Sequence, residues 1–168
     1  LFDTFAAFLE EVLNINNDQD SFHLKHFLTF ISFFISSIFF YKIINQRFKN
    51  PFFALLITFF YITSPRIFAE SFYNCKDIVF MSCAVMSIHY ALRSFENFSF
   101  KNIFFFSMLT AFATNVRVMG IFIFFLFLFF LLLSSLEEKR FLKKNINKLF
   151  CLIIFYTFIT FVFWPFLW

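Results

Sequence analysis

The sequence predicts an all-α protein: a polytopic integral membrane helix bundle of about six transmembrane helices, preceded by an interfacial amphipathic helix. Its 168 residues are 61% hydrophobic and 14% charged, with 38 phenylalanines and one glycine. A soluble domain carries about 25% charged residues and cannot bury so many aromatic rings. The basic residues also gather in short loops between apolar runs, as in membrane proteins. The net charge of +4 therefore does not indicate nucleic-acid binding.

The N-terminal segment, residues 1–15, has helical periodicity but is too polar to span a bilayer. We expect it to lie in the membrane interface. Its apolar face carries Phe2, Phe5, Leu9, Val12 and Leu13, and its polar face Asp3, Glu10 and Asn14. Residues 16–21 form a polar turn, in which Asp20 or Ser21 is predicted to cap the next helix.

Six apolar segments then predict six crossings. Pro51 suits the first turn of the second crossing, and Arg117 marks a helical hairpin between the fourth and fifth. Trp164 and Trp168 form an aromatic belt after the last one. We expect residues 1–168 to be one transmembrane domain and an internal fragment of a longer protein. The crossings are expected at about residues 22–45, 51–64, 78–92, 103–114, 118–133 and 149–163.

The distribution of positive charge predicts the orientation. Three loops, at residues 42–50, 93–101 and 139–148, carry ten of the fourteen lysines and arginines. By the positive-inside rule these loops are cytoplasmic. The segments that join the crossings on the other side, including residues 64–77 and 115–120, then lie outside.

Candidate site residues gather in the outer segment at residues 64–77. Arg66, Glu70, Lys76 and Asp77 lie there between two apolar segments, where ionisable groups are costly and usually face a cavity or a partner. Arg66, Lys76 and Arg117 abut the ends of apolar runs, and together they suit a phosphate group. Alternatively, each snorkels or pairs locally, as Arg66 can with Glu70 at helical spacing. Asp77 can cap the third crossing, a role compatible with contact to a substrate or a metal.

Other chemistries have weaker support in the sequence. His23 and His26 lie three residues apart without a third ligand at matching spacing, so we expect no metal site there. A divalent metal elsewhere is left open. Lys25, at the outer start of the first crossing, is a further candidate for the site, whereas His89 is predicted to be packed. The single glycine gives no support for a phosphate-binding loop.

The segment Ser64–Asp77, with its Ser-Pro-Arg, Ser-Phe-Tyr-Asn and Lys-Asp groups, resembles the polytopic glycosyltransferases of the GT-C superfamily. The likeness is to the bacterial branch related to protein O-mannosyltransferases and aminoarabinose transferases. The segments at residues 24–28, 115–120 and 163–168 also resemble parts of these enzymes.

The resemblance implies transfer of a sugar from a polyprenyl-phosphate-linked donor to a lipid, glycan or protein acceptor. It further implies a bacterial inner membrane and an active site that faces the periplasm or the exterior. Lys76 and Asp77 match positions that line the family's cavity, and Arg66 and Arg117 match basic positions near the carrier phosphate. Glu70 stands where many relatives have a histidine. The family's catalytic aspartate is expected before residue 1, so Asp3 is not assigned to that role.

Two other functions compete with this interpretation. A transporter with an anion-binding cavity would explain charges at membrane depth, but such folds often show glycine-rich broken helices and a repeated half, which this sequence lacks. A non-catalytic membrane subunit would leave the outer charges unexplained. The glycosyltransferase hypothesis accounts for them best, with developing phosphate charge stabilised by preorganised cations.

Overall fold

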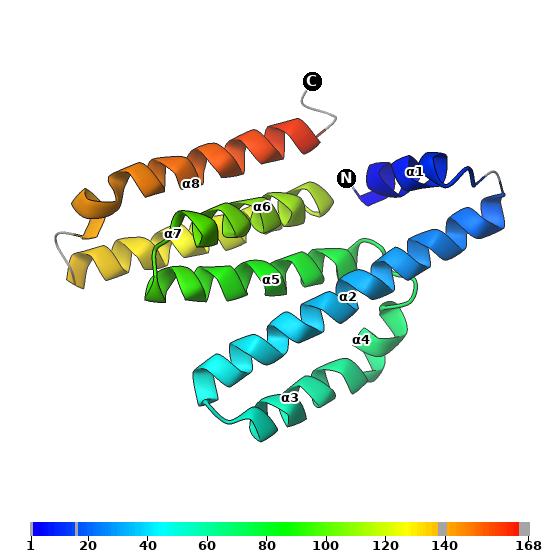
Figure 1. The fold of residues 1–168 in the computed structure, drawn as a ribbon, viewed down its shortest axis with the longest axis horizontal. Coiled ribbons are helices and arrows are strands. Elements are labelled where there is room, and N and C mark those ends of the chain that lie inside the picture. The colour runs from blue at the N-terminus through cyan, green and yellow to red at the C-terminus, as the bar shows by residue number, and fades with distance from the viewer. Residues whose placement is uncertain (1, 16, 138–140, 165–168) are drawn as a thin grey trace. The chain divides into compact units, whose positions relative to one another are not determined.

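The chain is entirely helical in the part that its computed structural model describes, which confirms the predicted all-α class. Described are residues 2–15, 17–137 and 141–164, with the backbone only for 135–137 and 141–144. Figure 1 shows the order of the helices: α1 (Phe2–Val12), α2 (Asp18–Phe48), α3 (Pro51–Thr63), α4 (Pro65–Glu70), α5 (Asp77–Glu96), α6 (Phe100–Val116), α7 (Gly120–Glu137) and α8 (Phe141–Phe163).

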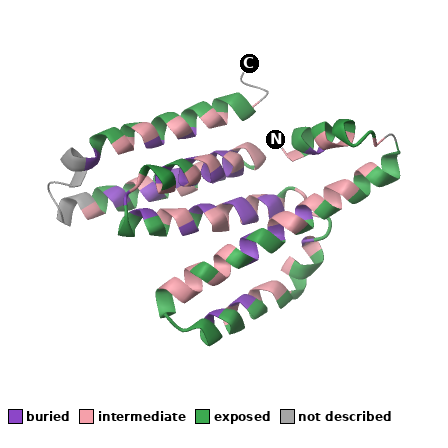
Figure 2. Cartoon of the chain, viewed as in Figure 1, coloured by how far each residue is buried: buried purple, intermediate pink, exposed green. Residues whose placement is uncertain are grey.

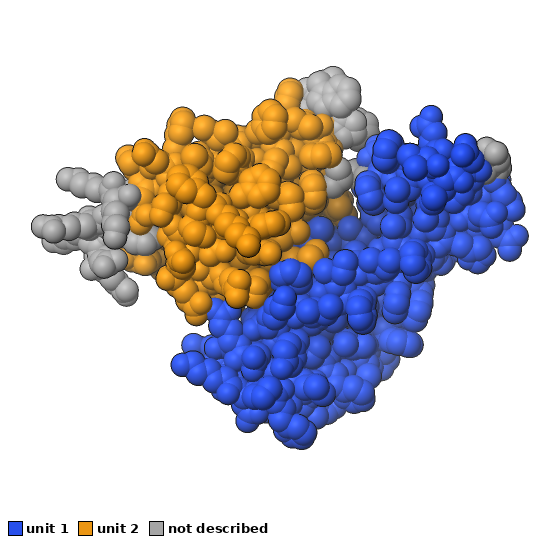
Figure 3. All heavy atoms as spheres, viewed as in Figure 1, with its two compact units in different colours: residues 1–85 blue, residues 86–168 orange. Residues whose placement is uncertain are grey.

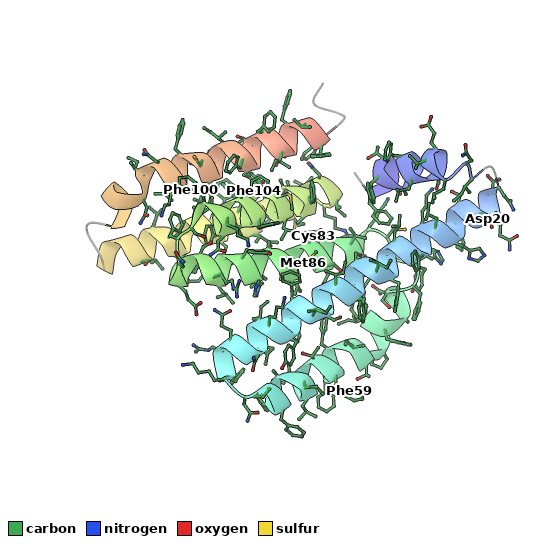
Figure 4. All side chains as sticks on the ribbon, viewed as in Figure 1. Asp20, Phe59, Cys83, Met86, Phe100 and Phe104 are labelled. Carbon is green, nitrogen blue, oxygen red and sulfur yellow. The ribbon has the colours of Figure 1, made fainter. Side chains whose placement is uncertain are left out.

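The helices form two compact units, residues 1–85 and 86–168 (Figure 3). The division falls within α5, between Val85 and Met86; Met86 is labelled in Figure 4. Each unit is described by itself below. The expectation of a single transmembrane domain stays a prediction.

Among the residues that the structure describes, three helices are long and apolar enough to cross a membrane: Asp18–Phe48, Asp77–Glu96 and the part of α8 from Asn145 to Phe163. They coincide with the first, third and sixth predicted crossings. The second and fifth fall on shorter apolar helices, Pro51–Thr63 and Gly120–Ser134, and the fourth falls on α6, which has 17 residues. The chain is thus an integral membrane helix bundle, whereas the count of six crossings stays a prediction.

The first unit is built on a hairpin of α2 and α3. Asn50 caps α3 by accepting hydrogen bonds from the backbone N–H groups of Phe52 and Phe53, and Pro51 occupies the first turn as predicted. Tyr61 on α3 packs between Phe33 and Phe40 of α2, with ring centroids 5.7 and 4.4 Å away. These aromatic contacts bring the end of α3 beside the middle of α2.

The predicted start of α2 was wrong. The helix begins at Asp18, and its cap is Asn17, whose side chain accepts a hydrogen bond from Gln19. Neither Asp20 nor Ser21 serves as the cap, because both lie inside the first helical turn. The Ser21 hydroxyl instead donates to Glu10 of α1.

The second unit packs α6 against both α7 and α8. Its core contains the fully buried side chains of Ile103, Phe106, Leu131 and Leu152. Polar contacts join α6 to α8 in the described part of the second unit: the Ser107 hydroxyl donates to the Leu152 carbonyl, and the Thr114 and Tyr156 hydroxyls lie 3.1 Å apart. Such hydrogen bonds hold helices together where lipid provides no hydrophobic driving force.

The loops of this unit are shorter than the sequence predicted. The predicted loop 93–101 is helical at both ends, with Ser99 as the cap of α6, and the predicted loop 139–148 is helical from Phe141. Polar and basic side chains at helix ends can extend a helix past its apolar part, which explains the difference. Residues 138–140 and 165–168, including Trp168 of the predicted aromatic belt, lie outside the described residues.

Large apolar side chains remain exposed on most helices (Figure 2). On α3, for example, only Ala54 and Thr58 are buried, whereas Phe52 is 77% exposed. Phe100 and Phe104, labelled in Figure 4, lie one turn apart on α6 and are both exposed. A surface this apolar is that of a membrane protein.

Candidate functional site

A chain of polar contacts connects α4 to the start of α5. The Arg66 Nε donates to Glu70 Oε1 at 3.0 Å, so these two residues form the local pair considered from their spacing. The Asn74 amide nitrogen then donates to both flanking carboxylates, to Glu70 Oε2 at 3.3 Å and to Asp77 Oδ2 at 3.0 Å. Arg66, Glu70, Asn74 and Asp77 thus form one hydrogen-bonded series, which we call the α4–α5 polar chain.

Asn74 also positions the first turn of α5. Its side-chain oxygen accepts a hydrogen bond from the Asp77 backbone N–H at 3.0 Å, as a helix-capping side chain does. The prediction that Asp77 caps α5 was therefore wrong in detail. Asp77 lies in the first turn, where its carboxylate is still favourable for the helix dipole, but the capping side chain is that of Asn74.

The cations of this region are exposed. The Arg66 side chain is 87% exposed, against 21% for its partner Glu70. An exposed ion pair of this kind contributes only about 0–1 kcal/mol to stability. Lys76 is also exposed, and none of the contacts among the described residues engages its amine. Both cations are thus available to a ligand, while the carboxylates are held in place.

Lys25 has a different environment. Its amine lies 3.4 Å from Glu10 Oε1, and the Ser21 hydroxyl donates to the same carboxylate. The Ser21 hydrogen bond, followed by the charge of Lys25, lowers the pKa of Glu10 below its usual 4.5. Lys25 therefore forms an ion pair between α2 and α1. This contact explains the presence of a cation at this position without a bound ligand.

Arg117 lies in the second unit, at the turn between α6 and α7. It follows the last residue of α6, its backbone N–H bonds the Ala113 carbonyl, and its side chain is exposed. The helical hairpin predicted around Arg117 is confirmed. Its convergence with Arg66, Lys76 and Asp77 on one cavity stays a prediction, because these residues belong to the first unit.

Sequence reasoning did not single out Asn74 or Asn115 as functional. Asn74 is part of the quoted Ser-Phe-Tyr-Asn group, and its spacing of four from Glu70 and three from Asp77 could have indicated its bridging position. Asn115 lies two residues before Arg117, and neither polar atom of its buried amide has a hydrogen-bond partner among the described residues. A buried unsatisfied amide is unusual and needs an explanation.

Two of the three histidines pack among other side chains. His26 packs on the ring of Phe22, with centroids 3.9 Å apart, and His89 is buried as predicted. No group of three His, Cys, Asp or Glu side chains that could hold a metal ion occurs among the described residues.

Comparison with known families decides between the functions that the sequence left open. The model of the dolichyl-phosphate-mannose-protein mannosyltransferase family matches residues 5–164, nearly the whole chain. The chain belongs to this family. It is therefore a membrane glycosyltransferase of the mannosyltransferase-like kind, whose family generally uses polyprenyl-phosphate-linked sugar donors. No curated protein and no solved structure matches the chain.

Proposed function

We propose that this membrane glycosyltransferase transfers a sugar from a polyprenyl-phosphate-linked donor to an acceptor on the non-cytoplasmic face of the membrane. The α4–α5 turn supplies part of its donor site. The observation that carries the proposal is the α4–α5 polar chain, which holds two carboxylates in place beside the exposed cations Arg66 and Lys76.

In this proposal the cations Arg66 and Lys76 bind the donor phosphate. When the sugar leaves its carrier, negative charge develops on the phosphate, and a preorganised cation at a site of low dielectric stabilises it. Arg66 contributes a guanidinium fork, of which only Nε is engaged by Glu70, and Lys76 contributes a point charge. Arg117 of the second unit is a further candidate ligand for the phosphate.

Asp77 has the role of orienting or deprotonating the acceptor hydroxyl. A general base must lie within hydrogen-bond reach of the proton that it removes. The Asn74 amide fixes one Asp77 oxygen through a 3.0 Å hydrogen bond, and this contact restricts the carboxylate to one orientation. Glu70 positions both Arg66 and Asn74 and has no direct part in the chemistry. A divalent metal at Asp77 is compatible with this role but is not required by it.

Transfer assays on the full-length protein test the proposal. Lys76→Ala should lower kcat/KM by roughly 10- to 100-fold, the range for a lost hydrogen bond to a charged group, and Lys76→Arg should restore part of it. Asp77→Asn should lower kcat more than KM.

The matched control is Lys101→Ala. Lys101 is also an exposed lysine at the start of an apolar helix, α6, in a loop expected to be cytoplasmic. Its variant should transfer sugar at the wild-type rate. Equal activities of the Lys76→Ala and Lys101→Ala variants, at equal membrane insertion, would reject Lys76 as a phosphate ligand.

A further inference from the structure

The turn between α2 and α3 carries cations that no nearby carboxylate balances. Lys42, Arg47 and Lys49 are all exposed, and none of the ion pairs among the described residues involves them. The sequence has no Asp or Glu between Asp20 and Glu70, so neither helix places a carboxylate at this end of the hairpin. The α2–α3 turn, defined here as residues 42–53, therefore has a net charge of +3.

This α2–α3 turn lies at the end of a helix that is long and apolar enough to cross a membrane. Its cations follow the apolar part of α2, and every residue from Arg47 to Phe53 is exposed (Figure 2). Phe48 and Phe52 are each more than half exposed beside these cations. Cations next to exposed apolar side chains suit the boundary between lipid headgroups and acyl chains.

The backbone of the turn holds these side chains in place. The Lys49 N–H donates to the Asn45 carbonyl at 2.8 Å, the Asn50 side chain caps α3, and the rings of Phe48 and Phe53 meet edge to face. Lys49 has a positive φ of 52°. This left-handed position after a helix favours glycine, because a side chain there is strained. A requirement for charge at this position would account for the lysine.

We propose that the α2–α3 turn binds the headgroup of an anionic phospholipid of the surrounding bilayer. Guanidinium and ammonium groups both bind phosphate oxygens, whereas a zwitterionic lipid carries its own cation and gains little from them. Each basic residue near an anionic membrane surface strengthens binding by about fivefold. The turn lies at the opposite end of α3 from α4, so this inference goes beyond the proposed function and does not rest on it.

Photochemical labelling of the full-length protein tests this site. The probe is a phosphatidylglycerol with a diazirine next to its glycerol backbone, at low mole fraction in nanodiscs of phosphatidylcholine. Labels, mapped by mass spectrometry, are expected on residues 42–53. Unlabelled phosphatidylglycerol should displace the probe, whereas phosphatidylethanolamine, which is zwitterionic, and free glycerol phosphate should not.

Two double variants remove the same charges, one arginine and one lysine each. Arg47→Gln combined with Lys49→Gln should reduce labelling of the α2–α3 turn roughly 25-fold, about fivefold for each cation. Arg93→Gln combined with Lys101→Gln is the control. Arg93 and Lys101 are exposed cations in a loop expected on the same side of the membrane, so their loss should leave labelling of the turn unchanged.

Lys49→Gly separates the charge from the fold and provides a second test if the double variant does not insert. Glycine adopts the left-handed backbone without strain, so this variant should unfold at a higher temperature than Lys49→Gln. Both single variants should nevertheless lose labelling of the turn about fivefold, because both lack the cation.

Equal loss of labelling in the two double variants would overturn the inference, since it would show a general effect of basic loops. Wild-type labelling in Lys49→Gly would also overturn it. So would displacement by glycerol phosphate, which would indicate a site for soluble anions, or by phosphatidylethanolamine, which would indicate ordinary contact with the bilayer.

Discussion

Asn74 is the residue whose replacement should affect the site most specifically. Asn74→Ala removes three side-chain hydrogen bonds: the cap of α5 and the two amide bonds to Glu70 and Asp77. Loss of an Asn cap costs about 1 kcal/mol, and each half-exposed hydrogen bond adds about 0.5–1 kcal/mol. The turn should therefore lose about 2–3 kcal/mol of local stability.

Amide hydrogen exchange in nanodiscs measures this loss directly. With every 1.4 kcal/mol worth a factor of ten, exchange of the amides in the first turn of α5, at Asp77 and Ile78, should accelerate by roughly 30- to 150-fold. Asn74→Ser retains the cap oxygen but lacks an amide group to bridge the carboxylates. Its exchange should lie between wild type and Asn74→Ala, whereas transfer should fall in both variants because Asp77 loses its fixed orientation.

Asn50→Ala is the control for this experiment. Asn50 caps α3 at the far end of that helix and has no described carboxylate partner. Its replacement should accelerate exchange at the start of α3 and leave transfer unchanged. If Asn74→Ala leaves exchange at the start of α5 unchanged, or if both variants lose transfer equally, the positioning role of the polar chain is refuted.

Three further predictions follow from other contacts. Gly120→Ala should destabilise the α6–α7 hairpin by about 1–3 kcal/mol, because a Cβ there would meet the backbone of α6 at 2.4 Å; thermal unfolding in detergent checks this. Glu10→Gln should weaken the contact of α1 with α2 at neutral pH, so that proteolysis and amide hydrogen exchange of α1 become faster. In the wild type the stability contributed by the Glu10 carboxylate, whose pKa is lowered on folding, should be present above pH 4.5 and be lost as the pH falls further, through its folded pKa. Lys148→Met should accelerate exchange at the α5–α6 turn, because the Lys148 amine donates to the Phe98 carbonyl.

Each of these has a result that contradicts it. An unchanged melting temperature for Gly120→Ala, beside an equally unchanged Met119→Ala control in the same turn, would show that the hairpin can shift at no cost. If the protection of α1 against proteolysis or exchange does not change with pH, the Glu10 carboxylate does not stabilise the contact between α1 and α2. If amide exchange at the α5–α6 turn in the Lys148→Met variant is as slow as in the wild type, contacts other than the Lys148 hydrogen bond stabilise that turn.

Composition and periodicity predicted the helical membrane class, because long apolar segments in a bilayer satisfy their backbone hydrogen bonds by forming helices. The Asn50-Pro51 start of α3 and the turn at Arg117 were also predictable, since both depend on local backbone chemistry. The cap at Asn17 was missed because Asn16, Asp18, Asp20 and Ser21 beside it are residue types that suit the same position. The bridging role of Asn74 was missed because it depends on where two carboxylates meet in space.

The central claim is that the α4–α5 turn faces outward and meets the donor phosphate, and the native Cys75 thiol can report on both. Cys75 is partly exposed and adjoins Lys76, whereas Cys83 is buried in α5. A membrane-impermeant maleimide applied to oriented vesicles should label Cys75 from the non-cytoplasmic side, with Cys75→Ser as the control. Polyprenyl phosphate should slow that labelling and polyprenol should not. Labelling from the cytoplasmic side, or a rate indifferent to polyprenyl phosphate, would contradict the account.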